Sequence, residues 1–339
     1  MELLRILAAM AVIVLHFNYY PGSSGATDYA VGFNRAFLNL LECVCICAVN
    51  VFLLISGAFG SRGKRIKIRK LGLLLLQTSV FRFAANVVSC IVAHDLNVGK
   101  LLSALIPVNY YVILYVSLML VSPFINAGLE RLSDAALQRL ALIAFLVFSA
   151  FSTLVDVAGE VLGNSLSGLS PVGIDGSMGG YTIVNFALMY LLGAWLGREE
   201  RSRTKLAGTP LLATVLALSV LLLYLWRAYL PQTAWMYSNP LVIVEACAAF
   251  LLFSRMRFSS RWINRIAPAA FTCYLIHEYA LYFLDYQKVG LSAFPIMLGT
   301  LALIVLGIYG LSVITHFIWN SIIARLFPDR SGGLTISAE

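Results

Sequence analysis

Long apolar runs dominate this sequence and constrain its fold more than any other feature. A helix that spans the hydrocarbon core of a bilayer needs about 20 consecutive, mostly apolar residues. Only 12% of the residues are charged and 60% are apolar, whereas soluble domains have about 25% charged residues. Ten runs suit this role: 3–20, 34–60, 71–93, 108–127, 138–158, 182–198, 210–230, 240–256, 266–284 and 295–318.

The ten runs predict an all-α, polytopic membrane protein with about ten transmembrane helices. Backbone groups in lipid find no water, so each spanning run must satisfy its own hydrogen bonds as a helix. We expect a single membrane domain over residues 1–320 and a short tail over 321–339. The first run lacks the positive start and the A-x-A site of a signal peptide, so we expect it to be retained as a span.

The distribution of basic residues predicts the orientation. Of the 24 lysines and arginines, 19 fall in connections or termini on one side, four fall on the other, and Arg82 lies within a run. Cytoplasmic connections carry the excess of Lys and Arg, so we expect both termini to be cytoplasmic. The net charge of +8 does not indicate nucleic-acid binding, because the basic clusters lack the interleaved aromatic side chains that stack on bases.

A few ionisable side chains lie within the apolar runs. Such groups cost at least about 2.5 kcal/mol at the bilayer centre, and they usually face the interior of the helical bundle. They either mark a reaction path or form buried ion pairs and hydrogen bonds between helices. The group comprises His16, Glu42, Arg82, Glu245, His277, Glu278 and His316.

Arg5 and His16 stand out within this group. Their separation of eleven residues corresponds to about three helical turns, so both lie on one face, about 16 Å apart along the axis. Arg5 would meet the cytoplasmic headgroups, and His16 would lie near the middle of the bilayer. Histidine suits proton transfer near neutral pH. His277 and Glu278 reach the same depth from another helix, and with Glu42 they are candidate supporting residues.

Four segments carry a family resemblance. The opening ELLRILAAMAVIVLH contains Arg5 and His16 and resembles the Arg-x10-His signature of the acyltransferase family 3. Three further segments resemble blocks of that family in order: AVNVFLLISGAFGSR (48–62), NYYVILYVSLMLVSPFIN (109–126) and FTCYLIHEY (271–279). The resemblance spans nearly the whole chain. It implies an enzyme that moves an acyl group from acyl-CoA to an extracytoplasmic glycan, with Arg5 and His16 in its catalytic site.

The sequence departs from the family pattern in three ways. The family usually has Arg-x-x-Arg and a proline after the second helix, whereas the segment from Arg62 to Lys70 has no proline before the next run. Tyr110 or Tyr111 stands where the family has a tryptophan. Residues 1–339 show no soluble esterase-like domain of the kind fused to some family members, so we expect the protein either to finish the transfer itself or to pass the group to a separate extracytoplasmic transferase.

Two sets of side chains are candidates for substrate contacts. The first is basic and suits the phosphates of CoA, although it also serves as a topology signal: Arg62, Arg65, Lys67, Arg69 and Lys70. The second set would line a substrate channel, and its alternative role is hydrogen bonding between helices: Ser56, Tyr111, Tyr115 and Asn126.

The connection 157–181 is the long outer segment, with seven glycines, four serines and no lysine or arginine. It is either a flexible loop over an opening or a plain linker. Cys43, Cys45 and Cys47 alternate around a helix and cannot share one metal ion. We therefore expect no metal site and no bound cofactor.

The preferred interpretation is a multi-pass acyltransferase of the bacterial plasma or inner membrane. We expect acetyl-CoA as donor and a glycan or lipid-linked saccharide as acceptor. His16 would act as a general base or as a transient acyl carrier. The alternatives are a proton-coupled secondary transporter, since intramembrane His and Glu also build proton relays, and an inactive scaffold. Transporters often contain repeated halves, and we find no internal repeat.

Overall fold

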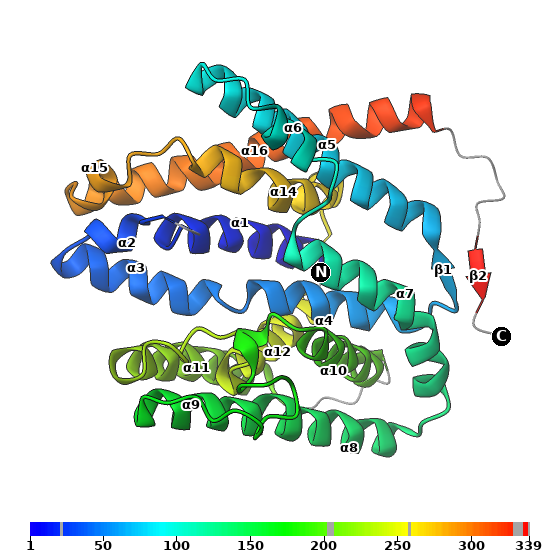
Figure 1. The fold of residues 1–339 in the computed structure, drawn as a ribbon. Helices are drawn as coiled ribbons and strands as arrows, with labels where there is room; N and C mark the ends of the chain where they lie inside the picture. The colour runs from blue at the N-terminus through cyan, green and yellow to red at the C-terminus, as the bar shows by residue number, and fades with distance from the viewer. Residues whose placement is uncertain (21–22, 202–206, 257–258, 328–334, 338–339) are drawn as a thin grey trace.

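The computed structural model describes residues 1–339 except 21–22, 202–206, 257–258, 328–334 and 338–339. The described chain is almost entirely helical (Figure 1). Two three-residue strands, β1 (Arg65–Lys67) and β2 (Thr335–Ser337), pair in antiparallel register with Ile66 opposite Ile336. The structure therefore confirms the predicted all-α class.

Each of the ten apolar runs forms helix. These helices are α1 (Glu2–Asn18), α3 (Gly32–Cys45) with α4 (Ala48–Gly60), α5 (Ile68–Ala93), α7 (Tyr110–Glu130), α8 (Asp134–Phe145) with η1 (Leu146–Phe151) and α9 (Ser152–Leu162), α10 (Ile183–Arg201), α11 (Thr209–Tyr229), α12 (Pro240–Ser254), α14 (Ala270–Leu281) and α16 (Phe294–Leu326). Shorter helices connect them: α2 (Ala26–Tyr29), α6 (Val98–Ser103), η2 (Met178–Gly180), α13 (Arg261–Ile266), η3 (Ala267–Ala269) and α15 (Tyr286–Gly290).

Six helical segments among the described residues are long and apolar enough to cross a membrane: 32–60, 68–93, 110–130, 134–162, 209–229 and 294–326. Shorter apolar helices cover residues 183–198 and 240–254. The chain is thus a helical protein with several candidate membrane spans. The total of about ten spans and the cytoplasmic location of both termini stay predictions. Helix α16 continues to Leu326, beyond residue 320, where we expected the membrane domain to end.

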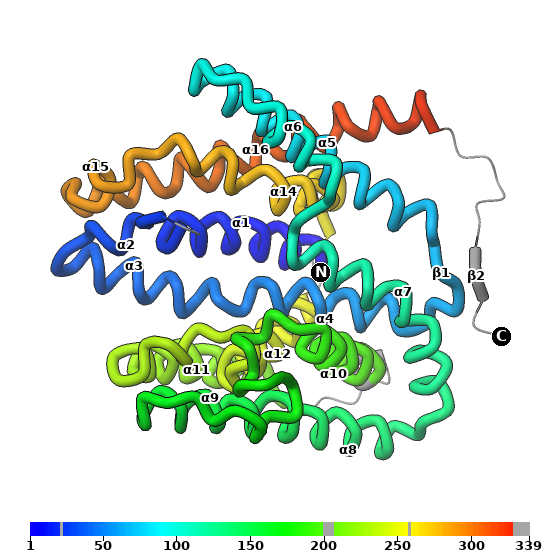
Figure 2. The backbone as a smooth tube through the Cα atoms, viewed as in Figure 1, coloured from blue at the N-terminus to red at the C-terminus, as the bar shows by residue number. Residues whose placement is uncertain are grey.

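Helix α1 lies at the centre of the bundle, between α14 and α16 on one side and α3 and α4 on the other (Figures 1 and 2). Its buried residues contribute to two apolar clusters. Leu4, Ala8 and Val12 pack with α4, α10 and α12. Ile6, Ile13 and Phe17 pack with α14 and α16. Because α1 is packed on both sides, polar side chains on it are held among several other helices.

Small residues bring α4 and α10 into close contact. A methyl group on Gly57 would collide with the backbone carbonyl of Tyr190, and one on Gly193 would collide with that of Leu54. Membrane helices associate through such close backbone approach, because lipid supplies no hydrophobic force between them. The Ser56-Gly57 pair is therefore fixed in position, and Ser56 faces the site described below.

Candidate active site

Two histidines from different helices meet in the interior of the bundle. His16 lies in the last turn of α1, and His277 lies on α14, which packs beside it. Their ring centroids are 4.6 Å apart, and the ring planes are inclined by 70°. The His277 side chain is fully buried. The equal depth predicted from the sequence thus corresponds to a direct contact between the two rings.

Glu278 completes a three-residue cluster. Its Oε1 lies 3.8 Å from His16 Nδ1. The Nδ1 of His277 faces the carbonyl oxygen of Cys273 at 3.1 Å, and because a carbonyl only accepts, this nitrogen carries the proton. Within the described part of the chain, His277 Nε2 and His16 Nδ1 have no hydrogen-bond partner although both are buried. Buried polar atoms are nearly always paired, so these two nitrogens are available to a substrate.

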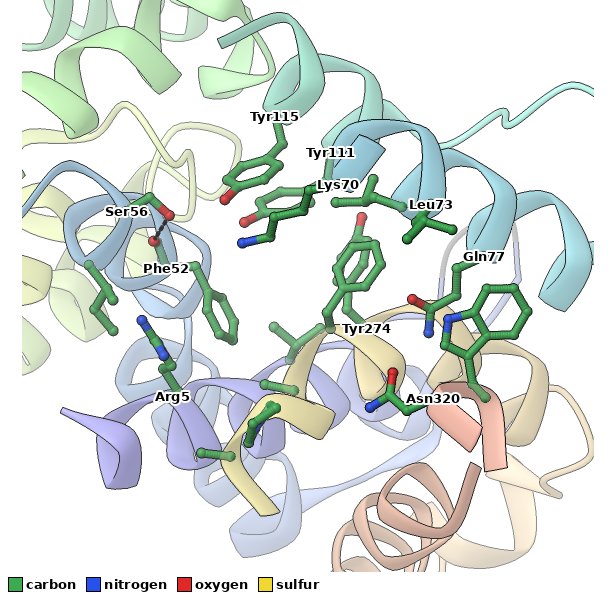
Figure 3. A pocket seen from close by; sticks show the side chains of 18 of the residues that line it. Arg5, Phe52, Ser56, Lys70, Leu73, Gln77, Tyr111, Tyr115, Tyr274 and Asn320 are labelled. Atoms are coloured by element: carbon green, nitrogen blue, oxygen red, sulfur yellow. Dashed lines mark hydrogen bonds between the residues drawn. The ribbon is translucent and has the colours of Figure 1, made fainter. Parts of the chain in front are cut away.

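A cavity of about 490 Å³ lies beside this cluster, within the usual size range of small-molecule sites. Arg5 and Lys70 point into it from different helices, and Phe52 lies between them (Figure 3). Ser56, Tyr111 and Tyr115 also line it. Two cations and several hydroxyl groups over apolar walls suit an anionic ligand that has an apolar part.

The cavity and the histidine pair are one turn apart. Val12 and Tyr274 line the cavity, and they precede His16 and His277 by four and three residues, respectively. The Tyr274 ring lies 5.8 Å from the His277 ring and 4.8 Å from the Tyr111 ring. A continuous row of aromatic side chains therefore leads from the cavity to the histidines.

Arg5 is held by an acidic neighbour. Its Nη1 donates to both carboxylate oxygens of Glu2, at 2.9 Å and 3.1 Å. This pair is about one-third exposed, and exposed pairs contribute little to stability. The guanidinium can therefore exchange Glu2 for the phosphate of a ligand at small cost.

The predicted donor-binding residues are divided in the structure. Lys70 lies in the cavity, while Arg65 and Lys67 lie in β1, which pairs with β2. Arg69 donates to the carbonyl oxygen of Phe327, and Arg62 is exposed next to the strand. Only Lys70 of this set reaches the cavity among the described residues.

Two other predicted site residues lie elsewhere. Asn126 donates to the carbonyl oxygens of Gly60 and Gly63 and accepts from Tyr190, so it clamps α7 to the end of α4. Glu42 accepts a hydrogen bond from Asn18 at 2.9 Å. Neither residue lines the cavity or contacts the histidine pair in the described structure.

The sequence analysis missed several cavity residues, among them Gln77, Tyr274 and Asn320. Gln77 on α5 donates to Thr272, and Asn320 comes from α16. No motif marks these two positions, because their helices meet α14 only in the folded bundle. Tyr274 could have been found, because it lies in the segment FTCYLIHEY, one turn before His277.

The histidine cluster also has the composition of a metal site. His16, His277 and Glu278 each offer one ligand atom, and these atoms lie within 4.8 Å of one another. Catalytic zinc sites often have three protein ligands of this kind. Without a metal ion, the same three groups form an acid–base cluster. A chelator distinguishes the two possibilities, because it would inhibit only an enzyme that uses a metal ion.

The comparison with protein families agrees with this geometry. The family model described as an acyltransferase domain, that of acyltransferase family 3, matches residues 1–318 of the 339. The chain is a membrane acyltransferase by this match, which includes the histidine cluster and the cavity residues Arg5 and Lys70. It belongs to acyltransferase family 3. No curated protein and no solved structure matches the chain.

Proposed function

We propose that this protein transfers an acyl group, most simply acetyl, from cytoplasmic acyl-CoA to a hydroxyl group of an extracytoplasmic glycan or lipid-linked saccharide. The observation that carries the proposal is the contact of His16 with His277 and Glu278 one turn beyond a cavity that contains Arg5 and Lys70. We place the enzyme in the bacterial plasma or inner membrane.

The cavity suits the donor. Lysine and arginine bind phosphate groups through charge and hydrogen bonds, and Arg5 and Lys70 offer both near the basic segment 62–70. The apolar wall around Phe52 suits the pantetheine arm and a short acyl chain. The thioester would then lie beside Tyr274, within reach of the histidine pair.

The reaction follows from the positions of the three groups. His16 takes the proton of the acceptor hydroxyl as its oxygen attacks the thioester carbonyl, and the C–S bond breaks. The departing thiolate receives that proton, which yields the acyl ester and CoA with its free thiol. Glu278, next to His16 Nδ1, stabilises the imidazolium that forms between these steps. His277 fixes the ring of His16 by packing against it.

A second course uses the same residues. His16 attacks the thioester first and carries the acyl group on its ring until the acceptor hydroxyl removes it. Rapid mixing of enzyme and radiolabelled acetyl-CoA without acceptor separates the two courses. Label that stays with the protein and is lost in His16→Ala indicates the carrier, and its absence indicates the general base.

The test of the proposed function is His16→Ala. We expect acyl transfer from acetyl-CoA to alkali-deacylated host polysaccharide to fall by about 10²–10⁴-fold, with donor binding and thermal stability close to those of the parent. The control is His94→Asn, because His94 is exposed at the end of α5, outside the cavity and the cluster, and asparagine tolerates its left-handed backbone conformation. Near-normal transfer by folded His16→Ala protein would refute the proposal. If the chelator phenanthroline abolishes acyl transfer and added zinc restores it, the reaction requires a metal ion and the metal-free mechanism is refuted.

A further inference from the structure

Three connections on the predicted outer side each bring a tyrosine to one place. Tyr110 begins α7, Tyr181 ends the connection between α9 and α10, and Tyr237 lies between α11 and α12. The ring of Tyr181 lies 4.9 Å from that of Tyr110 and 5.2 Å from that of Tyr237. Both contacts are edge-to-face. We call these three residues the tyrosine platform.

Two rings of the tyrosine platform are exposed, and the third, Tyr237, is half-buried. Tyr181 is 55% exposed and Tyr110 is 41% exposed. The exposed faces of these rings can stack on a ligand. The side chains of Tyr110 and Tyr181 both interact with that of Tyr237, so the three tyrosines form one connected group.

The backbone that carries Tyr181 is held firmly. Tyr237 donates its backbone N–H to the carbonyl oxygen of Gly179 at 2.9 Å. Gly180 has a φ of 85°, and a Cβ there would lie 2.6 Å from the backbone nitrogen of Ser238. Two conformational demands thus meet in one turn: a left-handed backbone and a contact that excludes any side chain. The platform is preformed, so a ligand need not order it.

The carboxylates of this region are engaged by the protein itself. Asp156 accepts from the backbone N–H and the hydroxyl of Ser177. Glu160 accepts from the backbone N–H groups of Gln232 and Thr233. These hydrogen bonds attach the connection 157–181 to α9 and to the segment between α11 and α12. The structure therefore holds the connection in place, and it is not a loop without contacts.

The charge of this region points to the kind of ligand. The connection 157–181 contains no lysine or arginine, so it has no cation to bind phosphate or sulfate. Exposed aromatic faces with hydroxyl groups at their edges suit a neutral ring that has both C–H faces and hydroxyl groups. A pyranose sugar has this chemistry, whereas a nucleotide would require basic residues such as those in the cavity that contains Arg5 and Lys70.

The tyrosine platform adjoins the reaction site. Tyr110 is the neighbour of Tyr111, which lines the donor cavity. Tyr111 packs against Tyr274, and Tyr274 packs against His277. A ligand on the platform is therefore separated from the histidine pair by one row of tyrosines.

We propose that Tyr110, Tyr181 and Tyr237 form the binding site for a neutral saccharide, the acceptor of the acyl group. This inference rests on the proposed function for the identity of the ligand as acceptor, but the binding itself can be measured without catalysis. Donor and acceptor then approach the histidine pair from two sides, with the cationic cavity on one side and the neutral aromatic platform on the other.

The experiment compares Tyr181→Ala with Tyr181→Phe in purified full-length protein in nanodiscs. Saturation-transfer NMR with alkali-deacylated host polysaccharide, fragmented to short oligosaccharides, reports saccharide binding, and calorimetry with acetyl-CoA reports donor binding. Because one aromatic contact is worth about 0.5–1.5 kcal/mol, we expect Tyr181→Ala to weaken saccharide binding and raise its KM by about 2- to 12-fold. Tyr181→Phe should retain most of the saccharide binding, and acetyl-CoA binding should be unchanged in both variants.

The control is Tyr229→Ala, because Tyr229 ends α11 on the predicted outer side and is 83% exposed. It takes part in none of the ring contacts of the platform. Unchanged saccharide binding in Tyr181→Ala, or an equal loss in Tyr229→Ala, would overturn the inference. If the parent protein binds the saccharide but transfers no acyl group, the proposed function is refuted, whereas the assignment of the tyrosine platform as a saccharide site stands.

Discussion

Replacement of Glu278 by glutamine tests the reaction centre most directly, because it removes a charge and keeps the shape. The carboxylate lies 3.8 Å from His16 Nδ1. At this distance the attraction between unit charges is about 1 kcal/mol at a dielectric constant of 80 and about 4 kcal/mol at 20. If His16 is half protonated in the transition state, Glu278→Gln removes about 0.5–2 kcal/mol, equivalent to a rate loss of about 2- to 30-fold.

The exposure of Glu278 sets where the result should fall in this range. Its side chain is 44% exposed, so solvent screens the interaction and favours the lower end. We expect kcat for acyl transfer to fall and KM for acyl-CoA to stay unchanged, since Glu278 does not line the donor cavity.

Glu42→Gln is the matched control. It makes the same change at a buried carboxylate that contacts Asn18 instead of His16, and the new amide oxygen can still accept that hydrogen bond. Steady-state kinetics in nanodiscs measure both variants. A parental kcat in Glu278→Gln, or an equal loss in Glu42→Gln, would refute the electrostatic role of Glu278.

Three other predictions concern the donor, the packing and the topology. Lys70→Gln should weaken CoA binding by about tenfold, since a hydrogen bond to a charged group contributes about 1.5 kcal/mol or more. Lys67→Gln, in the strand, should leave CoA binding unchanged. Equal losses of CoA affinity in the two variants, measured by calorimetry, would show that the cluster acts only through its total charge. Gly57→Ala should destabilise the protein by about 1–3 kcal/mol through overpacking, whereas Gly299→Ala, which has open space around it, should leave the thermal midpoint unchanged. A reporter fused at Gly168 should report the extracytoplasmic side, and a cytoplasmic signal there would reverse the orientation.

Much of the fold could be predicted from the local sequence. A run of about 20 apolar residues leaves the backbone no partner in lipid except itself, and each of the ten runs forms helix in the structure. The spacing of Arg5 and His16 follows from the helical repeat alone. The position of His277 within its own run predicted that it lies level with His16, and the two rings are in contact.

The contents of the site could be predicted only in part. The basic segment offered six cations, and no pattern distinguished Lys70 from Arg65 or Lys67, because the strand pairing of the latter two depends on residues 335–337. Asn126 shares a helix face with Tyr111 and Tyr115 in sequence, yet it lies by the turn after α4 and binds two carbonyl groups there.

The sequence by itself determined which segments are helices, how far along its helix each polar residue lies and which face of that helix it occupies. Only the tertiary structure decided which faces meet. His16 reaches His277 because α1 packs against α14, and Tyr181 reaches Tyr110 because a turn at Gly180 fits closely against Ser238. The physical reason is that the helical repeat acts within one element, whereas the rotation and pairing of helices depend on close packing between residues far apart in the chain.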